Sequence, residues 1–448
     1  MSSVNNERNG YAGGPERMRW LYVLTIGLGF FTTGVSWGVY NSYLPKDFLP
    51  VFITGDFQMT IIGAIMVLDN IFAFFLQPYI GARSDRTWTR WGRRMPYIMV
   101  GVPIASVTFV LIAYGWAMAS FWFMMAALTV FNVSMAFYRA PVVALMPDLV
   151  GPEHRSKANG VINLMGGIGA VYAFAIASRI YKINDPVIGA MLGVTAEQSG
   201  PVLTFLTTAI IMVVALVLLF VFIKEPATPL PAEIKREMGI VEALRQVSLS
   251  RDRSAMLLLL AIFFWFLSYN AIETWFTTYG ANVLGFATAD ASFLLNGIAI
   301  SFIVFAVPAG YLAGRIGRKK TIAIGLVLML VALVLLIPAT DYVVILGLLA
   351  IAGTGWAFVN VNSIVMVWQL LGQSRLGAGT GLYYGFSMSA AILGPFITGI
   401  IFDAAALLMS IQGVTLLFPV SLVFLVIALL LTLSVRTGEV GDVAIVSE

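Results

Sequence analysis

Twelve long stretches of the chain are apolar enough to cross a lipid bilayer, and they constrain its fold more than any other feature. A helix needs about 20 apolar residues to cross the hydrocarbon core. The runs are continuous, unlike the alternating segments of a membrane β-barrel, so helices are favoured. The sequence therefore predicts an all-α membrane protein with twelve transmembrane helices. The predicted spans are 19–44, 57–82, 96–115, 119–146, 156–181, 201–223, 255–281, 290–315, 320–338, 342–371, 376–402 and 414–434.

The composition supports lipid as the main solvent of this chain. Of the 448 residues, 60% are hydrophobic and only 11% are charged, whereas soluble proteins carry roughly 25% charged residues. This excludes a soluble enzyme, a nucleic-acid-binding domain and a disordered chain. The chain has no cysteine and one histidine, His154. Disulfides and metal sites built from thiolates or several histidines are therefore excluded, and we predict no metal and no cofactor.

The distribution of lysine and arginine predicts the orientation of the spans. If the N-terminus is cytoplasmic, 22 of the 26 basic residues lie on the cytoplasmic side, and Lys46, Arg179 and Lys182 lie outside. Positive charge collects on the cytoplasmic side of membrane proteins. Both termini are therefore predicted to be cytoplasmic, in the plasma or inner membrane. No small-residue cleavage site follows the first span, so we interpret it as a retained helix, not a signal peptide.

The spans divide into two halves. A charged segment with three prolines in its first part, 224–254, separates six spans from six. The loop GARSDRTWTRWGRR (81–94) recurs as GYLAGRIGRKK (310–320), each after the second span of its half. Such a parallel repeat predicts two pseudo-symmetric six-helix bundles related by an axis along the membrane normal. The predicted parts are a tail (1–18), an N-terminal bundle (19–223), a linker (224–254), a C-terminal bundle (255–434) and a second tail (435–448).

The first of these loops has the residues of a gating loop. Glycine lets helix ends approach closely, and an aspartate among arginines can form charge pairs that join two helices on the cytoplasmic side. The loop resembles the G-x-x-x-D-R-x-G-R-R/K signature of the major facilitator superfamily. The second copy has Gly314 where the first has Asp85, so any such joint there is weaker or different. A topology signal without a gating role is the alternative. The candidate gating residues are Gly81, Asp85, Arg86, Gly92, Arg93 and Arg94.

Three ionisable residues lie well inside predicted spans: Asp69, Arg139 and Glu273. Each costs about 2.5–3.5 kcal/mol near the middle of a bilayer, so each is expected to face a protein cavity. An arginine that moves relative to a buried carboxylate changes its proton affinity, which makes the three candidates for substrate binding and proton coupling. No span contains histidine, so carboxylates would carry the proton. A structural ion pair between helices is the alternative, and Asp403, near the end of a span, is interpreted as structural.

Polar and aromatic residues share helix faces with these charges. Amides and carboxylates bind sugar hydroxyls, and flat aromatic rings stack on the CH face of a sugar ring. Helix–helix contacts and interfacial belts use the same residue types and remain the alternative. The glycine-rich stretches 163–170 and 379–395 predict close helix packing, and no nucleotide-binding loop occurs. The candidate lining residues are Trp37, Tyr40, Asn41, Asn132, Asn163, Tyr269, Asn270, Trp356 and Asn360, with Ser363 beside them.

Three stretches are similar to the sucrose/proton symporters, which belong with the glycoside–pentoside–hexuronide:cation symporters. They are QPYIGARSDRTWTRWGRRMPYI (77–98), YRAPVVALMPDL (138–149) followed by RSKAN, and 379–403. The resemblance implies that Arg139 binds sugar and takes part in proton coupling, and that Glu273 approximates an acidic position of the seventh span. Sodium-using relatives have an Asp-Pro pair where this chain has Gln77-Pro78, which favours protons. Asp69 matches no position of that pattern.

These observations predict a secondary transporter, not an enzyme. We expect a monomer in the lipid bilayer that takes up a sugar, a disaccharide or glucoside such as sucrose or maltose, together with a proton by alternating access. A proton-driven exporter of drugs or metabolites on the same fold is the nearest alternative. A non-transporting sensor or scaffold would be expected to have a large soluble domain, and the longest loop is only 224–254. A membrane enzyme and a nucleic-acid partner are not expected.

Overall fold

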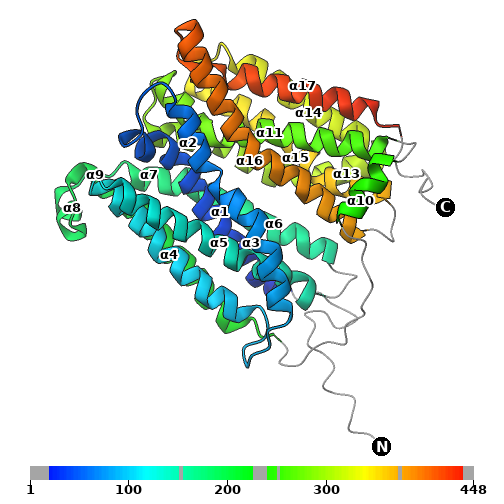
Figure 1. The fold of residues 1–448 in the computed structure, drawn as a ribbon, viewed down its shortest axis with the longest axis horizontal. Helices are drawn as coiled ribbons and strands as arrows, with labels where there is room; N and C mark the ends of the chain where they lie inside the picture. The colour runs from blue at the N-terminus through cyan, green and yellow to red at the C-terminus, as the bar shows by residue number, and fades with distance from the viewer. Residues whose placement is uncertain (1–19, 151–154, 226–239, 250–252, 372–375, 437–448) are drawn as a thin grey trace, which may run out of the picture. The chain divides into compact units, whose positions relative to one another are not determined.

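The computed structural model describes residues 20–150, 155–225, 240–249, 253–371 and 376–436 (Figure 1). Within these ranges, twelve helical segments are long and apolar enough to span a membrane, and each coincides with one of the predicted spans. The predicted all-α class with twelve spans is confirmed, and the chain is a multi-pass membrane protein.

The helices follow the hydrophobic runs, with short helices added at some of the connections. The helices of the first half are α1 (Trp20–Tyr43), α2 (Gln58–Met66), α3 (Leu68–Asp85), α4 (Met95–Ala117), α5 (Phe121–Leu149), α6 (Arg155–Val171), α7 (Ser178–Tyr181), α8 (Pro186–Leu192) and α9 (Ala196–Phe222). Those of the second half are α10 (Ile240–Leu249), α11 (Ser254–Asn282), α12 (Thr288–Leu294), α13 (Asn296–Ile316), α14 (Arg318–Leu336), α15 (Tyr342–Leu371), α16 (Leu376–Met409) and α17 (Leu417–Ser434).

One span starts earlier than its hydropathy indicates. The sixth span was expected from residue 201, but α9 begins at Ala196. Thr195 and Gln198 form a capping box, in which the backbone N–H of each residue is accepted by the side chain of the other at 3.2–3.3 Å. Such a box satisfies two backbone donors that a helix start leaves unpaired. The capping box therefore allows the helix to begin five residues before the apolar run.

The first two spans are interrupted. Beyond α1, the first span continues as a π-helical turn, Leu44–Phe48, and a 3₁₀ turn, Leu49–Val51, each with a proline at its start. Proline removes a backbone donor and prevents a regular α-helix from continuing. The second span is divided at Val67, which separates α2 from α3 with φ −88° and ψ −4°. Both spans thus contain points at which their two parts can change direction.

Packing divides the chain into two compact units. Unit 1 consists of Met1–Asn41 and Leu68–Ala232, and unit 2 of Ser42–Val67 and Glu233–Glu448. The boundary between Ala232 and Glu233 falls inside the predicted linker 224–254. Residues Ser42–Val67, however, group with unit 2, and we call them hairpin 42–67. The hairpin contains the end of the first span and the start of the second. Both chain connections between hairpin and unit 1 therefore fall close to the two interruptions.

In unit 1, α5 packs beside both α3 and α4, and α4 packs beside α9. Helices α1 and α6 approach each other at glycines. A Cβ atom on Gly34 would collide with the Gly166 carbonyl oxygen, and one on Gly169 would lie 2.9 Å from the Val35 nitrogen. The close packing predicted for 163–170 is present, because only glycine allows backbones to approach so closely.

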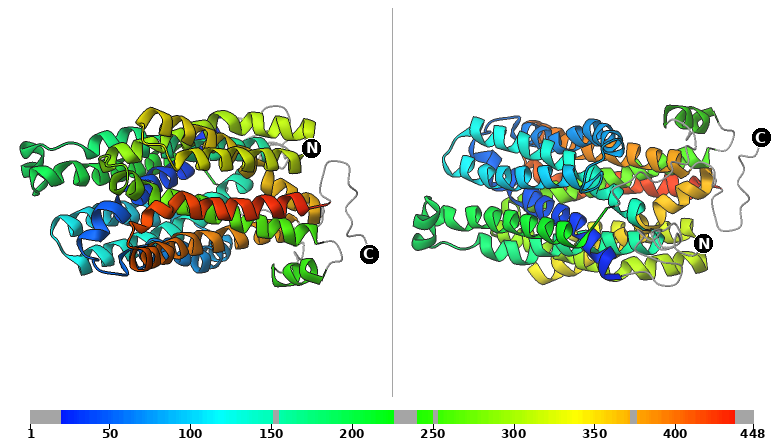
Figure 2. Two further views of the ribbon diagram at one scale, coloured as in Figure 1. Left: turned by 90° about the horizontal axis from the view of Figure 1, so that it is seen from above. Right: turned by 90° about the horizontal axis from the view of Figure 1, so that it is seen from below.

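In unit 2, α15 packs against α13 and α14, and α11 packs between neighbours α16 and α17. Figure 2 shows α17 (red) running beside the green α11. Gly325 and Gly355 face each other across α14 and α15, where a Cβ on either would lie 2.5–2.6 Å from the carbonyl oxygen of the other. In the predicted stretch 379–395, a Cβ on Gly394 would lie 3.0 Å from the Leu267 carbonyl of α11.

Candidate functional site

Helices α1 and α5 of unit 1 are joined by polar contacts inside the membrane-spanning region. The Thr32 and Tyr138 hydroxyls lie 3.4 Å apart, and the Asn132 amide lies 3.4 Å from the Tyr40 hydroxyl, to which it donates. All four side chains are buried. The two contacts lie about two turns apart along α1 and about 1.7 turns apart along α5. The sequence predicted Tyr40 and Asn132 as lining residues, and the structure brings them together.

Aromatic rings surround this contact. Tyr40 and Phe131 are stacked with centroids 5.9 Å apart, and the Trp37 ring meets Tyr40 edge-on at 5.2 Å. Trp37 keeps part of its surface exposed, whereas Tyr40 is fully buried. Of these two rings, Trp37 is therefore the one with exposed surface. Phe131 was not singled out from the sequence, because a phenylalanine inside an apolar run carries no polar signal.

Two predicted lining residues lie apart from that group's contacts. Asn41 follows Tyr40 on α1 and is half-buried. Asn163 is exposed on α6, and its amide donates to the Asn159 carbonyl of its own helix at 2.8 Å. A side chain bonded to its own helix is less free to bind a ligand, so Asn163 is the weaker candidate of the two.

Asp69 occupies the first turn of α3, directly after the interruption at Val67. The Asn70 amide donates to its Oδ1 at 2.9 Å. The first turn of a helix favours a negative charge, because its unpaired N–H groups carry partial positive charge. The break at Val67 thus gives Asp69 a favourable place within the span.

Asp69 and Arg139 lie at different positions along their helices, and their partnership stays a prediction. Asp85 at the end of α3 and Asp148 near the end of α5 bind the same arginine, Arg94. Asp69 precedes Asp85 by sixteen residues and Arg139 precedes Asp148 by nine, or about 24 and about 14 Å of helix. By helix rise alone, the two backbone positions are therefore offset by about 10 Å along the helices.

In unit 2, a second aromatic group is built by α11 and α15. Tyr269 and Trp356 stack almost parallel, with centroids 4.1 Å apart and an interplanar angle of 9°, and Phe266 meets Trp356 edge-on at 5.2 Å. Half-buried Glu273 lies about one turn along α11 from Tyr269. The Asn270 amide donates to the Phe266 carbonyl at 2.7 Å.

Helix α16 adds a residue to this group that the sequence analysis missed. The Tyr383 ring meets Phe266 edge-on at 6.1 Å. Its hydroxyl lies 3.3 Å from the Ser363 hydroxyl, which also lies 2.9 Å from the Asn360 carbonyl. Asn360 is half-buried on the same face of α15. The signal for Tyr383 was its position in the glycine-rich stretch GTGLYYG, but only packing shows that it faces α15.

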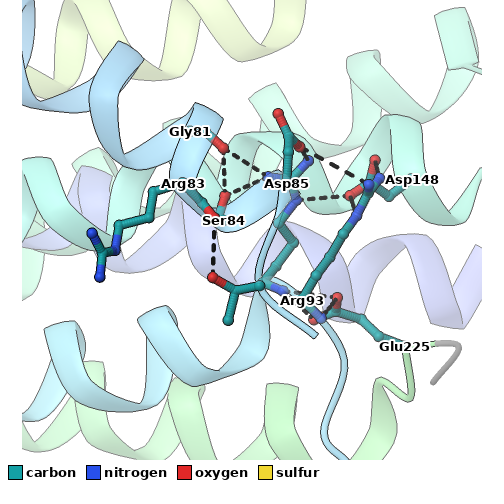
Figure 3. A network of polar contacts seen from close by, with 9 residues as sticks. Gly81, Arg83, Ser84, Asp85, Arg93, Asp148 and Glu225 are labelled. Carbon is teal, nitrogen blue, oxygen red and sulfur yellow. Dashed lines mark hydrogen bonds and ion pairs between the residues drawn. The ribbon is translucent and has the colours of Figure 1, made fainter. Parts of the chain in front are cut away.

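The loop 81–94 forms a charge network, which we define as Gly81, Ser84, Asp85, Arg93, Arg94, Asp148 and Glu225 (Figure 3). Arg94 is buried; its guanidinium donates to Asp148 Oδ2 at 2.8 Å and also binds Asp85, Ser84 and the Gly81 carbonyl. Arg93 donates to Asp148 as well, with Nε 3.1 Å from Oδ2. Two arginines from one loop therefore join the ends of α3 and α5.

Glu225, just beyond α9, completes the network. Its carboxylate accepts the backbone N–H groups of Arg93, Arg94 and Met95 at 2.7–2.9 Å, which caps the start of α4. Burial raises the pKa of Glu225, although these three donors act in the opposite direction. Gly92 has φ +99°, and a Cβ there would lie 2.6 Å from the Glu225 Cδ. Glycine is thus required at this position for two reasons, the positive φ and the close approach of Glu225.

The charge pairs predicted for this loop are present, and their gating role stays a prediction. Arg86, also a candidate, is exposed, and the pairs use Arg93 and Arg94 instead. The second copy of the loop is held differently: the Arg315 guanidinium lies 4.5 Å over the Tyr311 ring, and Lys319 Nζ donates to the Val435 carbonyl at 2.6 Å. The second copy lacks an acid in the position of Asp85, where it has Gly314.

In the described part of the chain, no three His, Cys, Asp or Glu side chains lie close enough to hold a metal ion. The polar groups of both units are instead amides, hydroxyls and single carboxylates beside aromatic rings. Such groups bind neutral polar ligands through hydroxyl hydrogen bonds and ring stacking.

The sequence model of the Major Facilitator Superfamily matches residues 26–395 and, in a second match, 288–443. The chain belongs to the Major Facilitator Superfamily. Among curated members, an isoprimeverose transporter of Lactiplantibacillus pentosus is 24% identical over 408 residues, which cover 86% of this chain and 80% of the relative. A sucrose transport protein of Arabidopsis thaliana is 28% identical over 138 residues, 26% of each chain.

Solved structures of the Major Facilitator Superfamily share the fold of this member. An inward-facing bacterial homologue of the human lysosomal transporter Spinster superposes with a TM-score of 0.75 at 16% identity, covering 94% of this chain and 97% of the other. The family predicted from the 81–94 motif is therefore confirmed, and its curated relatives are consistent with the sucrose-symporter-like branch.

Proposed function

We propose that this Major Facilitator Superfamily member takes up a sugar together with a proton by alternating access, as a monomer in the plasma or inner membrane with both termini cytoplasmic. One observation carries the proposal: each unit holds a carboxylate and an aromatic and amide group within its spans. In unit 1 these are Asp69 on α3 and the Trp37–Tyr40 pair, to which Asn132 is hydrogen-bonded. In unit 2 they are Glu273, one turn along α11 from Tyr269, and the Tyr269–Trp356 stack.

Both groups have the chemistry of sugar recognition. Aromatic faces pack on the CH face of a sugar ring, while carboxylates accept and amides donate hydrogen bonds to its hydroxyls. The same groups are expensive inside a membrane unless water or a ligand satisfies them. The names of the relatives, an isoprimeverose transporter and a sucrose transport protein, support a small saccharide as the substrate.

Proton coupling is supported by the position of the charges. Asp69 and Glu273 lie within spans that contain no histidine, so a carboxylate is the available proton carrier. Arg139 lies about 10 Å from the level of Asp69, as the helix rise gives. A sugar that binds near both residues changes the solvation of the carboxylate and its interaction with the arginine. Binding of sugar and binding of a proton would then depend on each other.

Uptake into proteoliposomes tests this proposal. Radiolabelled isoprimeverose and sucrose are supplied outside vesicles with an imposed inward proton gradient. We expect accumulation that a protonophore abolishes, and its loss in Asp69→Asn. The matched control is Asp341→Asn, because Asp341 caps the start of α15 through backbone N–H groups that an asparagine oxygen can still accept.

Gradient-dependent accumulation of neither sugar, by correctly folded protein, would contradict sugar–proton uptake. Efflux of a preloaded compound against its gradient would instead favour a proton-driven exporter. Undiminished accumulation by Asp69→Asn would remove Asp69 from the coupling mechanism.

A further inference from the structure

Asp403 of α16 holds the start of α2. Its buried carboxylate accepts the Met59 N–H at 3.1 Å, the Thr60 N–H at 2.7 Å and the Thr60 hydroxyl at 2.6 Å. From the sequence, Asp403 was interpreted as structural, and these partners on α2 could not be named. All these contacts lie within unit 2, because hairpin 42–67 is grouped with that unit.

Two further polar contacts hold the other arm of the hairpin. The Ser42 and Ser292 hydroxyls lie 2.9 Å apart and are buried, and the Thr288 hydroxyl donates to Asp47 at 2.9 Å. Both Ser292 and Thr288 belong to α12. Each of these contacts is a hydrogen bond that water can replace.

The backbones of α2 and α16 also touch. A Cβ on Gly63 would lie 2.6 Å from the Pro395 carbonyl oxygen, and one on Gly399 would lie 3.1 Å from the Thr60 Cα. The nearest atoms to both glycines are backbone atoms, so the two helices meet backbone to backbone at these points. Close packing through glycine combined with replaceable hydrogen bonds is suited to a contact that forms and breaks.

The chain is irregular where the hairpin meets unit 1. The π-helical turn Leu44–Phe48 follows one connection, and Val67 lies at the other. Interruptions of this kind absorb changes of backbone direction and recur at hinges. The hairpin can therefore change its direction relative to the chain on either side of it.

Water can reach the Asp403 contact. A cavity of about 510 Å³ in unit 2 is lined by Asp403 together with Asp56, Gln58, Asn282 and Gln412. A carboxylate that loses its partners inside dry protein is strongly destabilised. Beside a polar cavity of this size, Asp403 can exchange the Thr60 and Met59 donors for water when the contact opens.

We propose that Asp403 is a gate residue: its hydrogen bonds to Met59 and Thr60 hold hairpin 42–67 against α11, α12 and α16, and the hairpin separates from them once in each transport cycle. By the predicted orientation this gate is extracellular. The inference rests on the proposed transport function, but its opening can be measured without any sugar.

Engineered cysteines test the gate, since the chain has no cysteine of its own. Ser42→Cys with Ser292→Cys places two thiols in contact inside the gate, and Asp47→Cys with Thr288→Cys gives a second, less buried pair. Oxidation is followed by a gel shift with a polymer-linked maleimide. We expect oxidation to reduce uptake at least tenfold and a reductant to restore it, while each single cysteine variant keeps its uptake.

Full cross-linking of either pair with unchanged uptake would overturn the proposal, because the hairpin would then be a fixed part of unit 2. Failure of both pairs to cross-link would overturn it as well, because the closed contact would not form. The labelling experiment described next needs no sugar. If wild-type protein takes up no sugar but that experiment gives the expected result, the gate is supported and the proposed substrate is contradicted.

Asp403→Asn tests the carboxylate itself. Asparagine offers one acceptor oxygen where Asp403 uses two, so the closed gate is weakened. We expect a single cysteine at position 42 to react about tenfold faster with an impermeant maleimide in this background, as the loss of hydrogen bonds to a charged acceptor implies. Asp403→Glu should restore slow labelling. Equal labelling rates at equal thermal stability would contradict the role of Asp403.

Discussion

Asp148 and Asp85 bind the same arginine, but they should differ in how much they stabilise the protein. The Asp85 side chain is 53% exposed and that of Asp148 is 17% exposed, whereas Arg94 is 5% exposed. Exposed ion pairs contribute about 0–1 kcal/mol because water and salt screen them. Removing one partner of a buried pair costs about 3–5 kcal/mol, since the remaining charge loses its compensation.

The two substitutions to compare are Asp85→Asn and Asp148→Asn. Asp148 accepts from both Arg93 and Arg94, so its neutralisation leaves two neighbouring guanidinium groups without their shared acid. We expect a loss of about 3 kcal/mol in the free energy of unfolding for Asp148→Asn. For Asp85→Asn we expect less than about 1 kcal/mol.

Equilibrium unfolding of purified protein in mixed detergent micelles measures both values. Each substitution keeps side-chain size and one acceptor oxygen, so packing is matched and charge is the difference. Equal losses for the two variants, or a larger loss for Asp85→Asn, would refute the argument that burial decides the strength of this network.

Three further predictions concern single groups. Gly92→Ala should lower the free energy of unfolding by clearly more than Gly193→Ala. Both glycines have positive φ, which costs an alanine about 1–2 kcal/mol, but only a Cβ on Gly92 would also meet Glu225. Equal losses for the two variants would contradict this. Burial raises the pKa of Glu225 in the folded protein, so the stability that Glu225 contributes should be full below its unfolded pKa and should fall as pH rises through its folded pKa. Thermal unfolding measured from pH 4 to 8 should show this loss of stability. An identical pH dependence of the unfolding temperature in Glu225→Gln would refute the prediction. Tyr383→Phe should cost only about 1 kcal/mol in unfolding measurements, since Ser363 keeps a carbonyl partner on its own helix; a loss above about 3 kcal/mol would show that the hydroxyl has another role.

The spans and the charge pairs of loop 81–94 could be predicted because both depend on local sequence. Hydropathy over about 20 residues identifies a span, and the loop carries its arginines and aspartate within fourteen residues, 81–94. The interruption at Val67 could not be predicted, because IMVLDN contains neither proline nor glycine. Only the packing shows that the two parts of the span separate there, with α2 against α16 in unit 2 and α3 against α5 in unit 1.

Partners far apart in sequence were also beyond prediction. Glu225 caps the start of α4 across 130–132 positions of the chain, and Asp403 binds Met59 and Thr60 across 343–344. Each acid could be noticed in the sequence, but its donors are backbone N–H groups, which no residue type reveals. The axial offset of Asp69 and Arg139 likewise depends on how the ends of α3 and α5 are aligned by Arg94.

In the proposed mechanism, the carboxylates inside the spans carry a proton together with a sugar. Proton movement on addition of sugar to proteoliposomes, followed by a pH-sensitive dye trapped inside and with no imposed gradient, tests it most directly. We expect acidification of the interior when isoprimeverose or sucrose is added outside, and no acidification with Asp69→Asn. Sugar accumulation without any proton movement, or equal acidification with Asp69→Asn, would contradict it.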